Sequence, residues 1–183
     1  MKKILMLLVM LSFVTISYVD GFSLFNKGIK GSGDLQTETR DVDNFERIKI
    51  AGSFDVFITV GKKQSVEIRF DDNLLDNIET EVHGKTLVLD SHKSYSSKRN
   101  CKIEITVPKL ESVKLSGSGD IIIYELDNDF FEYELSGSGD LSAEGKVKDL
   151  EIYLSGSGDI FYYGTPKKID TKITGSGSII PKR

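Results

Sequence analysis

Apolar and polar residues alternate in short stretches along the second half of the chain. In each stretch, two apolar or β-branched residues flank one other residue directly before a Gly-Ser-Gly or related segment. Alternation with a period of two places the apolar side chains on one face of a β-strand, whereas a helix repeats about every 3.6 residues. The pattern therefore predicts strands at 113–115, 133–135, 152–154 and 171–173.

The strand stretches belong to a sequence repeat. Gly-Ser-Gly-Asp occurs at 31–34, 117–120, 137–140 and 156–159, Gly-Ser-Gly-Ser at 175–178, and Gly52-Ser-Phe-Asp55 is a degenerate copy. Successive copies begin 21, 65, 20, 19 and 19 residues apart. We interpret the gap of 65 residues as about three further units in which the motif has decayed.

A unit of this size predicts a stacked all-β architecture. It is too small to bury its own apolar face, and two short strands with two turns leave no room for a helix. Parallel stacking gives a β-helix of roughly seven coils, with about 4.8 Å of rise per coil. Glycine suits the corners because it accepts a positive φ or a tight bend, and Ser and Asp can hydrogen-bond the turn. A β-sandwich of short alternating strands is the competing architecture.

The middle of the chain is less regular. The segment 71–78 has the polar start of a short helical turn, and His83-Gly84 reads as a tight turn between strands at 78–82 and 86–90. Residues 92–100 are polar and predict a surface loop. Pro108 is expected just after a strand, where its missing N–H matters least.

The N-terminus has the pattern of a secretory signal. Lys2-Lys3 precede sixteen uncharged, mostly apolar residues, too few to span a bilayer as a helix. We expect a signal peptide over 1–21, cut between about Ser17 and Gly21, and a mature domain over 22–183; a retained anchor is the alternative. No cysteine follows the apolar run, which excludes a lipid-anchored lipoprotein. The protein is thus expected in the periplasm, at the outer membrane surface or outside the cell.

Charge and cysteine content exclude several classes of protein. The net charge is −4 and no basic stripe is present, which argues against a nucleic-acid partner. The single cysteine, Cys101, excludes a disulfide scaffold and a cysteine-rich zinc site. Because Cys101 precedes an alternating apolar run, we expect a buried, inert thiol.

Two strings carry a family resemblance. Ile103-Glu-Ile-Thr-Val-Pro-Lys-Leu110 and Val113-Lys-Leu-Ser-Gly-Ser-Gly-Asp-Ile121, with the later Gly-Ser-Gly copies, resemble the head GIN domain family of autotransporter adhesins. Segments 45–50 and 54–60 are similar to the opening of that domain, so the resemblance covers about 31–181. It implies a single-stranded right-handed parallel β-helix with Gly-Ser-Gly corners in an exported bacterial protein. It carries over no catalytic motif.

The repeated aspartates are one candidate for chemistry. Stacked carboxylates can bind calcium through oxygen, but at about 5 Å apart they also repel one another. The alternative, which we favour, is that each aspartate accepts hydrogen bonds from its own turn. The residues concerned are Asp34, Asp120, Asp140 and Asp159, with Ser178 replacing the aspartate in the last copy.

Carbohydrate hydrolysis is a second candidate, since it needs a converging pair of carboxyl groups. Outward glutamates on strands are more often simply solvated, and fold analogy alone supports no enzyme. The glutamates concerned are Glu132, Glu134, Glu144 and Glu151. A Gly-Lys-Thr string at 84–86 lacks the first glycine of a phosphate loop, and two histidines in the chain give Cys101 weak support as a nucleophile.

A binding surface is the third candidate. The alternation predicts that Lys114, Glu134, Tyr153 and Lys172 point outward, as do Ile122, Ser142, Phe161 and Ile180. Outward Ile122, Tyr153 and Phe161 could contact a surface glycan or a protein; sheet propensity or a homo-oligomer contact would explain them equally well. We therefore expect a non-enzymatic binding or adhesion module with no catalytic, cofactor-binding or metal site. The alternatives are a self-associating structural component of the envelope and a carbohydrate-active enzyme.

Overall fold

The structure is a computed structural model and describes residues 28–182, so the predicted signal segment lies outside the described residues. Strands and one 3₁₀ helix account for the regular structure of this region. In chain order they are β1 (Ile29–Lys30), β2 (Leu35–Thr39), β3 (Arg47–Ile50), β4 (Asp55–Val60), β5 (Ser65–Asp71), η1 (Asp72–Asn77), β6 (Ile78–His83), β7 (Thr86–Ser91), β8 (Tyr95–Ser96), β9 (Lys102–Val107), β10 (Ser112–Leu115), β11 (Ile121–Leu135), β12 (Leu141–Leu154), β13 (Ile160–Tyr163), β14 (Lys168–Ile173) and β15 (Ile179–Lys182).

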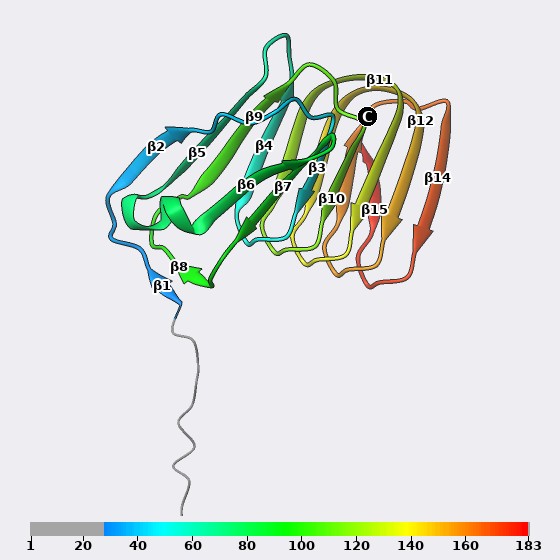
Figure 1. The fold of residues 1–183 in the computed structure, drawn as a ribbon. Helices are drawn as coiled ribbons and strands as arrows, with labels where there is room; N and C mark the ends of the chain where they lie inside the picture. The colour runs from blue at the N-terminus through cyan, green and yellow to red at the C-terminus, as the bar shows by residue number, and fades with distance from the viewer. Residues whose placement is uncertain (1–27, 183) are drawn as a thin grey trace, which may run out of the picture.

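All strands except β1 and β8 join one mixed sheet that curls over on itself (Figure 1). The long strands β11 and β12 belong to both layers of the curl. The first part of β11 pairs with β4 and its last part pairs with β10. One layer, the β4 layer, continues through β9 and β5 to β2; the other, the β10 layer, continues through β3 and β7 to β6.

The core lies between the two layers and is built from rows of aliphatic side chains. One row crosses four neighbouring strands of the β10 layer, and each member is at most 1% exposed. Full burial of such a side chain contributes about 1.5–3 kcal/mol. The residues of this row are Ile50, Leu115, Leu135 and Leu154. The apolar residues that alternate before the Gly-Ser-Gly segments thus lie on the inner face of the sheet, as the sequence predicts.

The prediction of a single-stranded right-handed parallel β-helix is wrong. The sheet is mixed, because β2 with β5, β5 with β9, and β6 with β7 all pair antiparallel. The prediction that the repeat continues through the gap between Gly52 and Gly117 is also wrong, because this segment contains no decayed coils. It holds hairpin and crossover connections, and Gly84, at φ +63°, reverses the chain between β6 and β7. Local turn chemistry overrides the period there.

Several local predictions are confirmed. Residues 72–77 form η1, the His83-Gly84 turn joins β6 to β7, and Pro108 follows the last residue of β9. The predicted loop 92–100 contains the two-residue strand β8, which pairs with β1. Leu74 and Leu75 of η1 are buried and close the core at its N-terminal end.

The Gly-Ser-Gly corners need glycine for a reason other than the one the sequence suggested. Among the glycines of residues 28–182, positive φ occurs at Gly33, Gly84 and Gly145 but at none of the stacked corner glycines. Instead, each corner lies directly on the previous one, so a Cβ on Gly137 would lie 2.9 Å from the carbonyl carbon of Gly117 and closer still to its oxygen. Close approach between backbones, not dihedral freedom, selects the glycine.

Candidate functional site

The corner aspartates form a hydrogen-bonded ladder. The Oδ1 atom of Asp120 accepts a hydrogen bond from the backbone N–H of Asp140 at 2.9 Å, and Asp140 accepts one from Asp159 at 2.8 Å. Asp55 begins the series and Ser178 ends it. Each carboxylate therefore bonds the next corner along the sheet, not its own turn as the sequence suggested.

Asp34 does not belong to this ladder. Its Gly-Ser-Gly copy lies at the other end of the sheet, where the Gly33 N–H donates to Asp71 Oδ1 at 2.7 Å and the Ser32 hydroxyl donates to Asp72. Within residues 28–182, acidic, histidine and cysteine side chains form no cluster of three or more able to hold a metal ion. The aspartates of the ladder accept hydrogen bonds from backbone N–H groups of the neighbouring corner.

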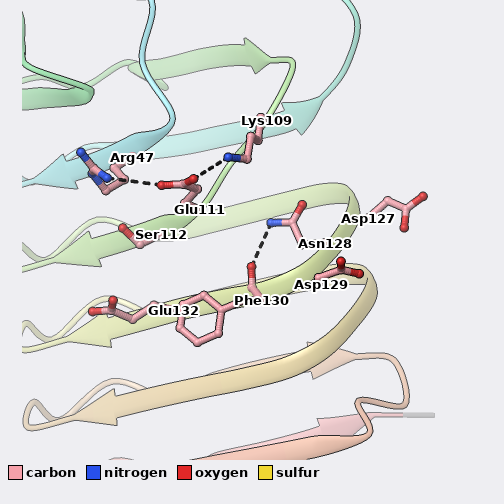
Figure 2. A pocket seen from close by; sticks show the side chains of 9 residues that line it. All are labelled: Arg47, Lys109, Glu111, Ser112, Asp127, Asn128, Asp129, Phe130 and Glu132. Carbon is pink, nitrogen blue, oxygen red and sulfur yellow. Dashed lines mark hydrogen bonds and ion pairs between the residues drawn. The ribbon is translucent and has the colours of Figure 1, made fainter.

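A pocket of about 680 Å³ opens on the outer surface of the β10 layer (Figure 2). Its lining comes from β3, from the connection between β9 and β10, from β10 and from β11. Figure 2 shows an ion-paired chain on one side of the pocket and the ring of Phe130 on the other. The lining residues are Arg47, Lys109, Glu111, Ser112, Asp127, Asn128, Asp129, Phe130 and Glu132.

Strand register creates the floor of the pocket. Ser112 lies between Arg47 on β3 and Glu132 on β11, and all three point outward in one row. Because serine is much shorter than its neighbours, the row is hollowed at this position. Ser112 is 4% exposed and its side chain lines the pocket.

Ion pairs hold the longer side chains around this floor. Glu111 bridges Arg47 at 3.3 Å and Lys109 at 2.5 Å, while Lys114 lies 3.1 Å from Glu132. Asn128 donates to the backbone oxygen of Leu110, which leaves its side-chain oxygen available. Four carboxylates and two cations line the pocket, and Lys114 and Lys148 pair with two of the carboxylates from outside the lining.

The charges around the pocket favour ionised carboxylates. Lys148 holds the pKa of Asp129 below its ordinary value. Lys85 and Lys109 together lower the pKa of Glu46, beside the pocket, from 4.5 to about 2. A general acid in glycoside hydrolysis needs a raised pKa instead. The environment of these two groups is that of charge-paired binding or structural residues.

Ile122 and Phe161 lie where the alternation predicts, on the outer surface. They share a row of the β4 layer with Phe57, Ser142 and Ile180, and all five are half-buried. We call this row the outer apolar row.

Tyr153 lies on the β10 layer instead, beside Glu134 and Lys172, and is 40% exposed. Its hydroxyl donates to Glu151 at 3.2 Å, and the Glu151 charge raises its pKa. The structure therefore separates Tyr153 from Ile122 and Phe161, so the three do not form one surface.

The candidate glutamates are also divided between the layers. Glu132, Glu134 and Glu151 lie on adjacent strands of the β10 layer, and Glu144 lies on the β4 layer beside Tyr163. Lys114 bridges Glu132 and Glu134. The three neighbouring glutamates are thus held by other side chains.

Cys101 departs from its prediction. The thiol is half-buried, not fully buried, and packs against the edge of the core. Its Sγ atom lies 4.0 Å from Asp71 Oδ2.

Sequence reasoning missed the pocket except for Glu132. Ser112, Asn128 and Phe130 carry no motif, and Arg47 is 65 residues away from Ser112 in sequence. The one usable signal is the alternation in 112–115, which makes Ser112 an outward residue. Only the pairing of β3, β10 and β11 shows that its neighbours are long and charged.

Comparison with known proteins identifies the family. The model of the family described as "Putative auto-transporter adhesin, head GIN domain" matches residues 44–181. The chain therefore belongs to the head GIN domain family, as the resemblance implies. No curated protein is detectably similar to it.

Solved structures share the fold at low sequence identity. A putative adhesin from Bacteroides fragilis is 20% identical with a TM-score of 0.54, covering 85% of this chain and all of the other. A putative lipid binding protein from Parabacteroides distasonis is 21% identical with a TM-score of 0.60, covering 86% and 100%. A putative cell adhesion protein from Clostridium sporogenes is 16% identical with a TM-score of 0.56, covering 81% and 99%. At these identities the likeness concerns the fold alone.

The adhesin description of the family is that of exported or cell-surface proteins. No helix in the part of the chain that the structure describes is long and apolar enough to cross a membrane.

Proposed function

We propose that this protein is an exported, non-enzymatic binding or adhesion module of the bacterial cell envelope, located in the periplasm, at the outer membrane surface or outside the cell. Membership of an adhesin family and the predicted signal segment support this proposal. A surface glycan or a protein is the expected ligand, and nucleic acid is not.

One observation carries the proposal: the pocket on the β10 layer places an exposed phenyl ring beside the hydroxyl of Ser112 and the amide of Asn128. The Phe130 ring is 45% exposed at the surface of an otherwise well-packed sheet. Ligand sites characteristically combine apolar contact area with a few placed polar groups. Both components lie on rigid strands, which suits recognition without movement of the backbone.

The ion pairs of Asp129 and Glu46 do not suit either group to act as a general acid. The lysine-paired Asp129 and Glu46 have lowered pKa values, which is opposite to the change that a general acid requires. The solved relatives named above are described as adhesion or lipid-binding proteins, and their names include no enzyme.

A retention assay tests the function. The protein, purified after export, is passed over immobilised mucins, matrix proteins and bacterial polysaccharides, and we expect saturable binding to one class. Retention on none of them contradicts the proposal. Reducing-end assays run on the same polysaccharides test the enzyme alternative: turnover that is lost on Glu132→Ala would overturn the non-enzymatic assignment.

Self-association is a second candidate, favoured by the open C-terminal end of the sheet. Every residue of β14 is exposed, and Ile169 and Ile173 are 39% and 49% exposed where they extend the core rows. Natural edge strands use lysine and proline to prevent pairing with a strand of another chain, and this end of the sheet carries Lys168, Lys172 and Pro181. Adhesion therefore ranks first. Light scattering over a range of concentrations decides: a constant monomer mass removes the second candidate.

A further inference from the structure

The pocket on the β10 layer also defines the chemistry of its ligand, an inference that rests on the proposed binding function. Three properties are decisive: the apolar wall, the mixture of hydrogen-bonding groups and the pairing of the charged groups. Each restricts the ligand independently.

The apolar wall is the ring of Phe130. It projects beside the polar floor instead of joining the core, where its neighbour Phe131 is fully buried. Exposure of a phenyl ring costs free energy that a ligand with an apolar face recovers by covering it. The face of a pyranose ring that carries axial C–H groups is such a surface, and a hydrated ion is not.

The polar groups include acceptors and donors within one small area. The Asn128 side-chain oxygen and the second carboxylate oxygen of Glu132 can accept hydrogen bonds, and the Arg47 guanidinium can donate them. The hydroxyl of Ser112 can do both. A ligand whose groups are themselves both donors and acceptors satisfies all four, and sugar hydroxyls have this property.

The lining offers an anionic ligand no unpaired cation. Four carboxylates and two cations line the pocket, and Glu111 already engages both cations. A phosphate, a sulfated glycan or a nucleic acid would have to displace the ion pairs that Glu111 makes with Arg47 and Lys109. The volume of about 680 Å³ lies within the range of small-molecule sites, about 300–1,000 Å³.

We propose that this pocket binds an uncharged sugar residue of a glycan, with one ring face stacked on Phe130 and its hydroxyls bonded to Ser112, Asn128 and Glu132. The site takes a hexose or an N-acetylhexosamine unit. The outer apolar row on the β4 layer is not part of it.

A glycan panel with matched variants tests this assignment. The purified protein is applied to immobilised neutral, sialylated, sulfated and uronic-acid glycans. We expect binding to neutral glycans, weakened about tenfold by Phe130→Ala and about fivefold by Ser112→Ala. The controls are Phe161→Ala and Ser142→Ala, the same residue types on the outer apolar row, which should change affinity less than about twofold.

The outcomes separate the ligand class from the binding function. Binding that is confined to anionic glycans, or to a protein, overturns the neutral-sugar assignment but leaves adhesion intact. Loss of binding in the Phe161 variant instead of the Phe130 variant moves the site to the outer apolar row. Absence of binding to every glycan overturns the neutral-sugar assignment, and absence of binding to the mucins and matrix proteins of the retention assay as well removes both proposals.

A second measurement covers the case in which a variant fails to fold. Titration of the unmodified protein with a free monosaccharide from the bound class should shift NMR resonances of Ser112, Asn128 and Phe130. Shifts confined to residues of the β4 layer would overturn the assignment without any substitution.

Discussion

Replacement of Gly137 by alanine is the sharpest test of the stacked corners. The added Cβ would lie 2.9 Å from the carbonyl carbon and 3.1 Å from the nitrogen of Gly117, and closer to its oxygen. Comfortable contact needs about 3.5–4.0 Å, so the two corners must separate by at least about 1 Å. Either backbone has to move, because no flexible side chain is available to yield.

The cost follows from what the separation breaks. The Ser138 N–H donates to Gly117 O at 3.1 Å, and the Asp140 N–H donates to Asp120 at 2.9 Å. With about 1 kcal/mol for each of the two hydrogen bonds and about 1–3 kcal/mol for overpacking, Gly137→Ala should destabilise the fold by about 3–5 kcal/mol. Reduced freedom of the unfolded chain offsets less than about 1 kcal/mol of this.

Gly84→Ala is the matched control. Gly84 has φ +63° but nothing within 4 Å of an added Cβ, so its substitution tests dihedral strain alone, at about 1 kcal/mol. Urea unfolding followed by circular dichroism gives both free energies of unfolding. A cost for Gly84→Ala equal to or above that for Gly137→Ala would refute the argument that close approach selects the corner glycines.

Three further predictions concern the ladder, the core row and the ion pairs. Asp140→Ala should cost about 1 kcal/mol and Asp140→Asn much less, because an amide oxygen can still accept from Asp159; millimolar calcium should leave the melting temperature unchanged. Leu154→Ala should lower the free energy of unfolding in urea by about 2–5 kcal/mol. Ile173 is next in the same row and half exposed, so Ile173→Ala should lower it by less than about 1 kcal/mol. Equal costs would mean that Ile173 is covered. The folded pKa of Glu46 is lowered from 4.5 to about 2, so its contribution to stability is present above pH 4.5 and is lost as the pH falls toward 2. Glu46→Gln should therefore flatten the plot of unfolding free energy against pH in that window. An unchanged plot would count against the ion pairs of Glu46 with Lys85 and Lys109.

The sequence predicted the local features of the fold better than its topology. Strand positions, outward and inward faces, the turn at Gly84 and the short helix at 72–77 all follow from alternation and turn residues, which act over a few neighbours. The direction in which β5 and β6 pair depends instead on connections across the gap between Gly52 and Gly117. No residue in that gap signals that β9 inserts between β4 and β5.

Alternation and residue type predicted only part of the candidate site. Glu132 was a candidate because it is a carboxylate, and Ile122, Phe161 and Tyr153 because they point outward. They do not form one surface, since the bend of β12 carries Tyr153 to the other layer. Surface neighbours on a curled sheet are set by which strands lie side by side.

By itself, the sequence determined the all-β class, the family, the apolar inner rows and the glycine corners, because each depends on residue identity at short, regular spacing. The tertiary structure decided the mixed curl of the sheet, the partner of each corner aspartate and the pocket. Those depend on pairing between distant strands: Ser112 becomes a pocket floor only when β10 lies between Arg47 and Glu132. Contacts of that kind arise from the register of the sheet, which no local pattern encodes.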